Sequence, residues 1–217
     1  MALFFIPYLN NNNKTSYVLL FYLIMRDLEQ FRLINQFELN IIDSAISKLN
    51  PKLHDFLIQN FNNIYISLAN LSSKVNYPSI FLISDDLQSS INHLKYNRDL
   101  IAAGLYLGFL RKSKFYLSLE GADYFYHNSL ISKNRFIVIN NKGEKSILYG
   151  NDVTKDMIIQ FPENIQKDNI FLIINELNEL LAISITKVDS TMLPNLKLKD
   201  VIAQNLVDKG IYLREKQ

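Results

Sequence analysis

Apolar residues change their spacing along the chain, and the change separates helical from strand-like stretches. Asn35 and Glu38 have the spacing of a capping box, and residues 37–49 carry apolar side chains at helical intervals. This pattern predicts a helix that ends at Asn50-Pro51, because proline disfavours helix at the residue before it. A second short helix is predicted over residues 53–61.

Compact apolar runs follow and favour strands. Residues 64–68 are β-branched and aromatic, residues 80–83 form a short apolar run, and residues 28–33 fit an edge strand. The Ser-Asp-Asp segment that begins at Ser84 predicts a capped short helix through residue 94. Residues 101–110 are long and apolar, and their periodicity alone fits a helix or a strand.

A basic break, Arg111–Lys114, separates the run 101–110 from the apolar residues 115–119, which predicts a β-hairpin. A helix is predicted over about residues 119–126. Residues 128–134 are polar and break the pattern, so we place a domain boundary there.

Beyond that boundary, short strands alternate with polar turns. Strands are predicted at residues 135–139, 170–174, 180–186 and 211–213, and Asn140–Gly143 has turn chemistry. Five or six short strands within residues 135–217 suggest a small barrel or sandwich. The pattern therefore predicts a first part with both helices and strands, followed by this strand-rich second domain.

Residues 1–24 differ from the rest of the chain. Four asparagines, a lysine and a proline divide them into two apolar runs, each too short for a membrane helix. The positive start and cleavage site of a secretory signal are missing. We expect an N-terminal extension ahead of a start at Met25, with no membrane anchor.

Composition narrows the possible functions. Of the 217 residues, 48% are hydrophobic and 20% charged, which suffices for a buried core. The chain has no cysteine, which excludes disulfides, cysteine-ligated metals and a thiol nucleophile. A net charge of +2 is not that of a polycationic nucleic-acid tail. The missing cysteine and export signal together predict a cytoplasmic protein.

No catalytic constellation emerges from the sequence. His54, His93 and His127 lie in no triad-like or metal-binding pattern, and no Gly-x-Ser-x-Gly or Walker motif occurs. Asp85-Asp86 fits helix capping better than magnesium binding. We therefore predict no enzyme activity, no metal and no cofactor.

Basic and aromatic residues remain as candidates for binding. Tyr149 beside Gly150 would offer a stacking ring next to a closely approachable backbone, and the alternative is a core tyrosine with a turn glycine. The basic residues at 111–114 fit a solvated hairpin tip. A small barrel could gather five further basic groups on one face, a weak signal for nucleic acid: Lys187, Lys197, Lys199, Lys209 and Arg214.

One segment resembles a known module. Ser146-Ile-Leu-Tyr-Gly-Asn-Asp-Val-Thr-Lys155 is similar to the Phe-Leu-Tyr-Gly-Asn-x-Val-x-Lys segment of a PUA domain, an RNA-binding module. The stretch from Asp208 to Arg214 resembles the Asp-x-Gly-x-Tyr-Leu-Arg end of that module. The two segments have the order and spacing of one domain of about 80 residues.

The first half resembles a particular family. Met25-Arg-Asp-Leu, the helix start at Asn35-x-x-Glu38 and the segment Ala102–Phe109 are similar to the archaeal and eukaryotic nuclear-import-protein-seven family. These are biogenesis factors of the large ribosomal subunit. The resemblance covers about residues 25–214 and implies an α+β protein. Its first part would be an α/β domain over residues 25–134, with an antiparallel sheet flanked by helices, and its second part a PUA β-pseudobarrel over residues 135–217.

The resemblance also implies a function. It implies non-catalytic binding of pre-ribosomal RNA, through single-stranded uridine-rich segments, and partners among ribosome assembly proteins, including the RNA-degrading exosome linked with archaeal members. Two alternatives stay open: a protein-interaction adaptor without RNA affinity, which eleven basic against eleven acidic residues in 135–217 would fit, and an RNA-modifying enzyme. The residues expected to contact RNA are Tyr149, Gly150, Lys155, Lys187, Lys197, Lys199, Lys209 and Arg214.

Overall fold

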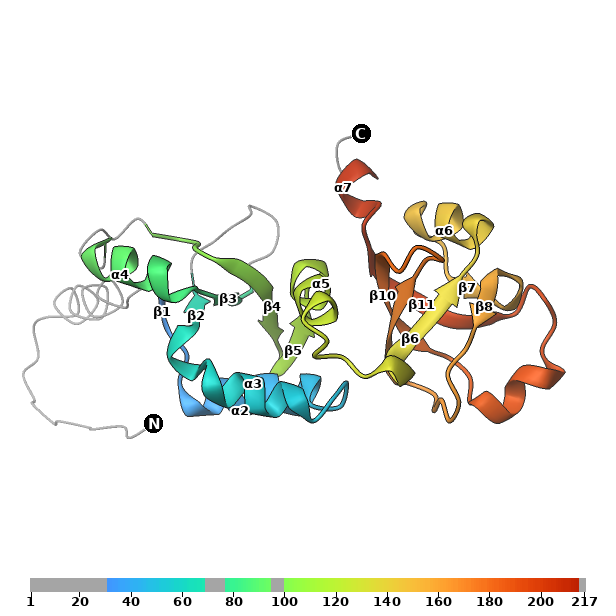
Figure 1. The fold of residues 1–217 in the computed structure, drawn as a ribbon, viewed down its shortest axis with the longest axis horizontal. Helices are drawn as coiled ribbons and strands as arrows, with labels where there is room; N and C mark the ends of the chain where they lie inside the picture. Colours follow the sequence, from blue (N-terminus) through green and yellow to red (C-terminus); the bar gives the residue numbers. More distant parts are fainter. Residues whose placement is uncertain (1–30, 69–76, 95–99, 215–217) are drawn as a thin grey trace, which may run out of the picture.

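Two β-sheets follow one another along the chain (Figure 1). The computed structural model describes residues 31–68, 77–94 and 100–214, so the predicted extension and the family-like start at Met25 lie outside the described residues. The first sheet, called here the N-terminal sheet, is antiparallel with the order β1-β2-β3-β4-β5. Its strands are β1 (Phe31–Leu33), β2 (Ile64–Ser67), β3 (Ser79–Leu82), β4 (Leu105–Arg111) and β5 (Lys114–Leu117).

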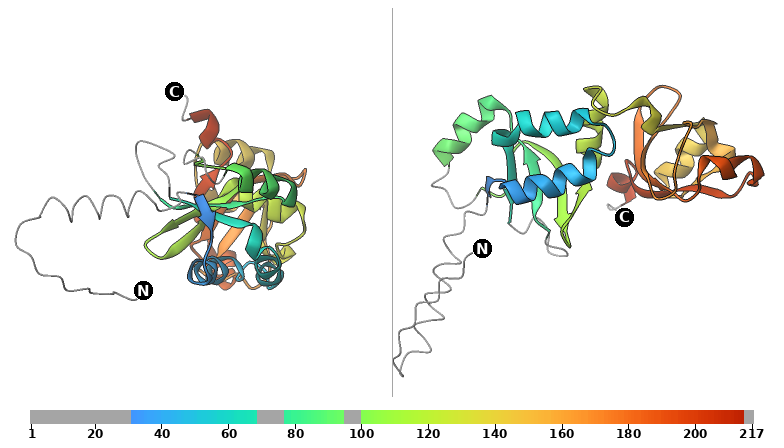
Figure 2. Two further views of the ribbon diagram at one scale, coloured as in Figure 1. Left: turned by 90° about the vertical axis from the view of Figure 1, so that its left-hand side faces the viewer. Right: turned by 90° about the horizontal axis from the view of Figure 1, so that it is seen from below.

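Helices α2 (Gln36–Ile46) and α3 (Lys52–Gln59) lie together on one face of the N-terminal sheet (Figure 2). The predicted capping box is confirmed, because Asn35 accepts from the Glu38 backbone and Glu38 accepts from the Asn35 backbone. Leu39, Ile42 and Ile46 point into the core. Phe37 lies outside this buried face and is 69% exposed.

The opposite face of the sheet is packed by α4 (Asp85–Leu94) near β1. Ile91 of α4 forms a small core with Phe31, Tyr65 and Phe81. Of residues 101–110, which the sequence left ambiguous between helix and strand, the second half belongs to strand β4. This part of the sheet therefore carries apolar side chains on both faces.

The predicted hairpin is confirmed. β4 and β5 pair with Phe109 opposite Tyr116 and Arg111 opposite Lys114. Lys112 and Ser113 form the two-residue turn, with φ values of 47° and 56°. Two positive φ angles match the right-handed twist of a hairpin, although non-glycine residues adopt them at a cost.

The predicted helix after the hairpin is also confirmed as α5 (Leu119–His127), which is capped by Ser118. A second sheet then forms a nearly closed barrel, called here the C-terminal barrel, with the order β7-β11-β10-β9-β6-β8. The predicted α+β class is thus confirmed. The strands of the barrel are β6 (Phe136–Ile139), β7 (Val153–Thr154), β8 (Ile158–Gln160), β9 (Ile170–Ile174), β10 (Leu180–Thr186) and β11 (Val201–Asp208).

Two local predictions are wrong. Asn140–Gly143 is not a turn, because Asn140 caps the helix α6 (Asn141–Leu148) by accepting from the Gly143 backbone at 2.8 Å. The predicted strand at residues 211–213 is instead the helical turn α7 (Ile211–Arg214), whose last residue donates its backbone N–H to Gly210 O at 3.1 Å.

The two halves of the molecule share buried contacts. One apolar cluster includes Leu119 and Phe125 of α5 together with Leu180 and Ile183 of β10. Three polar contacts also tie α5 to the barrel and the residues after it: Lys209 Nζ lies 3.2 Å from Asp123 Oδ1, Tyr126 Oη donates to Asn178 O at 2.9 Å, and Tyr212 Oη donates to Glu120. A fourth contact joins the two halves elsewhere, because Arg135 Nη2 donates to Lys48 O at 2.8 Å.

Candidate nucleic-acid interface

One exposed face of α6 carries two lysines, and the tyrosine that follows the last helical residue continues their line. Residues three and seven apart lie on the same side of a helix, so Lys142, Lys145 and Tyr149 form a single stripe, and all three are exposed. Gly143 and Ile147 lie on the opposite, buried side. We call these three residues the α6 stripe. Sequence reasoning missed both lysines, although their helical spacing from Tyr149 was a usable signal.

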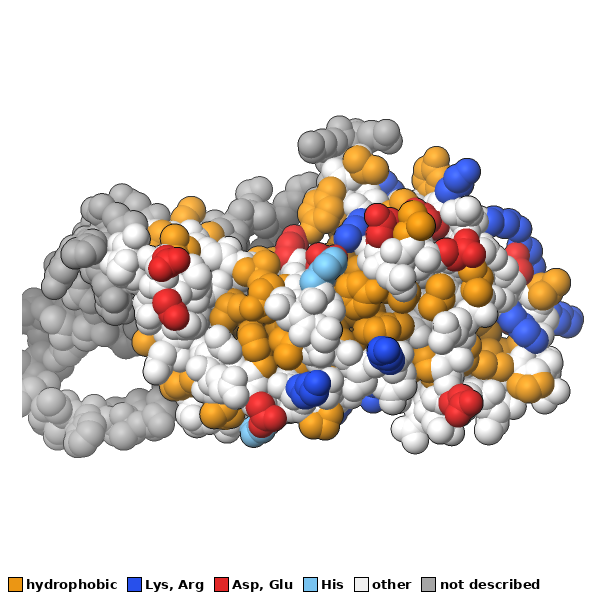
Figure 3. Space-filling model, viewed as in Figure 1, with side chains coloured by type: hydrophobic (Ala, Val, Ile, Leu, Met, Phe, Trp, Pro, Cys, Tyr) orange, Lys and Arg blue, Asp and Glu red, His pale blue; other side chains and the backbone are white. Residues whose placement is uncertain are grey.

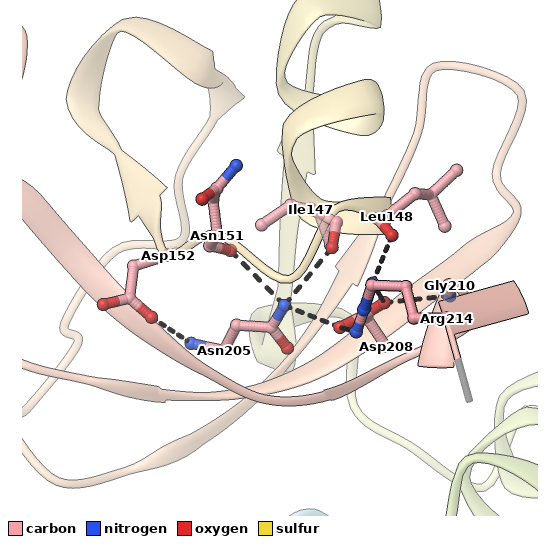
Figure 4. Close-up of polar contacts among 8 residues, drawn as sticks. All are labelled: Ile147, Leu148, Asn151, Asp152, Asn205, Asp208, Gly210 and Arg214. Atoms are coloured by element: carbon pink, nitrogen blue, oxygen red, sulfur yellow. Dashed lines mark hydrogen bonds and ion pairs between the residues drawn. The ribbon is translucent and has the colours of Figure 1, made fainter. Parts of the chain in front are cut away.

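Arg214 of α7 holds the carboxyl end of α6 and forms an ion pair with Asp208 of β11 (Figure 4). Asp208 is 3% exposed and accepts from both terminal nitrogens of Arg214 at 3.0 and 2.9 Å. Arg214 also donates to Leu148 O. The Asp208 carboxylate raises the pKa of Arg214 above its ordinary value, mainly through this hydrogen bonding.

Asn205 ties the same turn to β11 (Figure 4). Its side-chain nitrogen lies 3.0 Å from Asp208 Oδ2 and also donates to Ile147 O and Asn151 O, at 3.4 and 3.3 Å. Asp152 accepts from the Asn205 backbone at 2.9 Å. The turn after α6 is therefore held from both of its sides, and we call this network the Asp208 lock.

Two glycines make the lock possible. A Cβ on Gly210 would lie 1.9 Å from Leu148 O, a distance that no side chain tolerates. Gly150 has a φ of +88°, and a Cβ there would meet the Arg214 guanidinium at 3.3 Å. The residues that carry the sequence motif thus hold the turn in shape, and Tyr149 projects from it with 78% of its surface exposed.

The amino end of α6 lies beside a cluster of lysines around one carboxylate. Asp156 Oδ2 is 2.7 Å from Lys199 Nζ and 3.4 Å from Lys142 Nζ, and Asp156 Oδ1 accepts from Thr154 at 2.6 Å. Hydrogen bonds from Lys199, then from Thr154, hold the pKa of Asp156 well below its ordinary value. Two positive charges therefore share one negative partner.

The structure does not bring all the sequence-predicted residues onto one patch. Lys155, Lys187, Lys197 and Lys199 lie near the start of β11, and Tyr149, Gly150, Lys209 and Arg214 lie near its end. An eight-residue strand separates these ends by about 23 Å. The α6 stripe, which reaches from Asp156 to the Asp208 lock, connects the two groups.

The predicted cations also differ in how they are engaged. Lys155 Nζ donates to Leu193 O and Leu196 O at 2.8 and 2.7 Å, so it holds a neighbouring loop. Lys209 pairs with Asp123. Within the part of the chain that the structure describes, the ammonium groups of exposed Lys187, Lys197 and the stripe residue Lys145 have no hydrogen-bond or ion-pair partner, although the Lys197 backbone N–H donates to Asp200 Oδ2 at 2.8 Å.

Lysine and arginine side chains gather along the outer edge of the C-terminal barrel, at the right of Figure 3. Among the described residues, no group of three or more histidine or acidic side chains is placed to hold a metal ion. No helix within those same ranges is long and apolar enough to cross a membrane. The arrangement that is present suits contact with a phosphate backbone and an unpaired base.

Comparison with known proteins identifies the C-terminal barrel as a PUA domain. Residues 135–217 match the family model of the UPF0113 PUA domain. A protein of Archaeoglobus fulgidus named UPF0113 protein is 33% identical over 118 residues, which cover 53% of this chain and 63% of that protein. The match thus spans less than two thirds of the relative's own length.

Two solved structures share the fold of nearly the whole described chain. A conserved PUA domain protein from Thermoplasma acidophilum aligns with a TM-score of 0.55 at 12% identity, covering 86% of this chain and 98% of that one. A hypothetical protein from Pyrococcus horikoshii OT3 aligns with a TM-score of 0.55 at 14% identity, covering 84% and 98%. The arrangement of a first α/β half before a PUA barrel therefore recurs in archaeal proteins.

Proposed function

We propose that this protein binds single-stranded RNA through the α6 stripe of its PUA domain and acts without catalysis. The observation that carries the proposal is the continuous exposed face of Lys142, Lys145 and Tyr149. It places two ammonium groups beside a ring that projects from the turn fixed by the Asp208 lock. PUA domains commonly bind RNA, which supports the same reading.

The lysines and the tyrosine would contact different parts of the RNA. Lysines neutralise phosphates and release counterions, which gives affinity that falls with salt. Tyr149 would stack on an unpaired base, because single-stranded RNA exposes base faces that a duplex hides. Lys197 and Lys187 would extend the phosphate track from the amino end of α6, where Lys142 approaches Asp156 and Lys199.

Fluorescence anisotropy with a labelled uridine-rich strand tests the proposal across about 50 to 300 mM salt. We expect micromolar or tighter binding that weakens steeply with salt. Lys142→Ala with Lys145→Ala should lower the slope of log affinity against log salt by about 1, because each free lysine contributes about 0.7 and Lys142 is already shared with Asp156.

A matched pair of lysines serves as the control. Lys52→Ala with Lys133→Ala removes the same charge from exposed positions on α3 and on the segment before β6, away from α6. This control should leave the salt slope unchanged. Equal losses from both pairs would show that net charge alone drives binding, and no binding at low salt would favour a protein-interaction adaptor.

We further propose a role in large-ribosomal-subunit maturation in the cytoplasm. The support is the resemblance of residues 25–214 to the nuclear-import-protein-seven family. Crosslinking in cells should recover precursors of large-subunit RNA. Recovery of transfer or messenger RNA alone would contradict this assignment.

Protein partners form the last part of the proposal. The N-terminal half would contact ribosome assembly proteins, and in an archaeal setting the exosome. Affinity purification of the full chain before and after RNase treatment should retain these partners. Their complete loss with RNase would show that RNA alone bridges them.

A further inference from the structure

A row of stacked rings crosses strands β4 and β5 at one edge of the N-terminal sheet. Tyr77 and Phe109 stack with centroids 5.3 Å apart and an interplanar angle of 15°. Phe109 and Tyr116 stack at 5.0 Å and 8°. Arg111 lies over the Tyr77 ring, 5.1 Å from its centroid. We call these four side chains the aromatic ladder.

Backbone pairing sets the ladder. Phe109 of β4 and Tyr116 of β5 are direct partners across the hairpin. Leu110 donates its backbone N–H to Pro78 O at 2.8 Å, which brings Tyr77 beside the same strand. Cross-strand neighbours on one face stand about 5 Å apart, so flat rings at these positions stack without further adjustment.

The ladder is more exposed than the aromatic core of this sheet beneath α4. Phe31, Tyr65 and Phe81 lie beneath α4 and are at most 7% exposed. Tyr116 is 41% exposed, and Phe109 and Tyr77 are half-buried. Tyr116 is on β5, which is the last strand of the sheet, and Phe109 is the one ring stacked on it among the described residues.

The charge around the ladder is positive. Residues 105–117 hold Arg111, Lys112 and Lys114 and contain no acidic residue. Aromatic rings interleaved with cations are the features that bind single-stranded nucleic acid, because rings stack on bases while cations neutralise phosphates. An acidic protein segment would be drawn to the charges, but it would leave the stacked rings without matching planar groups.

We propose that the aromatic ladder is a second RNA-binding site, where an unpaired base stacks on Tyr116 and extends the row of rings. Arg111, Lys112 and Lys114 hold the adjoining phosphates. The inference rests on the proposed function in one respect, namely that RNA is the ligand. It adds a base-stacking site outside the PUA domain.

The absence of tryptophan from the chain permits a direct test. Tyr116→Trp and Tyr149→Trp each create a protein with one tryptophan, and the two variants report the ladder and the α6 stripe separately. A third variant, Phe37→Trp, places the probe on the exposed side of α2 as a control. Each is titrated with a uridine-rich single-stranded RNA and followed by tryptophan fluorescence.

Saturable quenching at position 116, with no change at position 37, is the expected result. Quenching at 149 but not at 116 would overturn the ladder site and leave the proposed function intact. Quenching at 116 alone would support the ladder and contradict the α6 stripe. Silence at both positions would overturn both.

Affinity gives a second measurement. Tyr116→Ala should weaken binding about 10-fold, because stacking one base on one aromatic ring typically changes the affinity by about this factor. Tyr116→Phe keeps the ring and should restore affinity. An unchanged affinity for Tyr116→Ala, in a protein whose unfolding curve shows it folded, would contradict the proposal.

Discussion

Tyr149 and Tyr116 are both exposed aromatic rings, but the molecule holds them in place by different means. Tyr149 stands on a turn that buried charge and amide groups fix, with Asp208, Arg214 and Asn205 at the centre. Tyr116 stands on a sheet and is held by the face of Phe109. The comparison shows two ways to place an exposed ring: a polar network can fix the backbone from which the ring projects, or another ring can stack on it directly.

Substitutions that remove the polar network under Tyr149 or the ring under Tyr116 should lower the stability of the protein by different amounts. Asp208→Ala should destabilise the protein by about 3 kcal/mol, because it leaves Arg214, the Gly210 N–H and Asn205 without their shared acceptor. Urea unfolding measures the loss. Asp208→Asn retains an acceptor and should cost clearly less, so equal losses for the two variants would contradict this account of the lock.

Removing the middle ring of the ladder should have a smaller effect. Phe109→Ala separates Tyr77 from Tyr116 and should cost about 2 kcal/mol, since each stacked pair adds roughly 0.5–1.5 kcal/mol. The loss should persist at high salt because no ion pair is involved. A Phe109→Leu variant separates the value of the ring from that of simple apolar bulk.

The hairpin tip offers a change in the opposite direction. Ser113 has a φ of 56°, a conformation that costs a non-glycine residue about 1 kcal/mol. Ser113→Gly should therefore stabilise the protein by up to about 1 kcal/mol in thermal unfolding. Ser89→Gly, in the exposed part of α4, is the matched control and should destabilise.

The Asp156 carboxylate at the start of α6 should make the stability of the protein depend on pH. The pKa of Asp156 is lowered on folding, so its stabilising effect is complete above the ordinary value of 3.8 and is lost as pH falls through the lower folded value. Asp156→Asn should therefore be less stable than the parent near neutral pH, and the difference should shrink in strong acid. Unfolding curves at pH 7 and pH 2 compare the two proteins.

The same substitution should strengthen RNA binding a few-fold, because it frees Lys199 and Lys142 from their shared carboxylate. Asp189→Asn removes an acid from the same barrel away from this cluster, and it should produce the smaller change. Weaker binding by Asp156→Asn would mean that the carboxylate orients the lysines for RNA.

Local signals in the sequence predicted local structure well. The capping box at Asn35 and the hairpin around Arg111–Lys114 were both predicted, since each depends on residues within a few positions. Residues 211–213 were predicted as a strand from their apolar character. Their helical turn depends instead on Gly210 and on Arg214 reaching back to Leu148, a contact 66 positions away that no local pattern encodes.

The candidate site shows the same limit. The motif predicted a turn with an exposed tyrosine at Tyr149 and Gly150, because a glycine permits a tight turn and a tyrosine beside it offers a ring for stacking. The sequence could not show that Lys155 is occupied by carbonyl groups of residues 193 and 196, or that Asp208 binds Arg214. Partners brought together by folding decide which cations remain free.

The Asp208 lock also has a consequence for the order in which the protein is made. The turn at Tyr149 is synthesised early in the PUA domain, but its fixing groups, Asn205, Asp208 and Arg214, are among the last described residues. Because the ribosome adds about 5–20 residues per second, these fixing groups are synthesised several seconds after the turn. A nascent chain stalled with residue 204 just outside the exit tunnel should cross-link RNA at Tyr149 poorly, and one stalled after residue 214 has emerged should do so well.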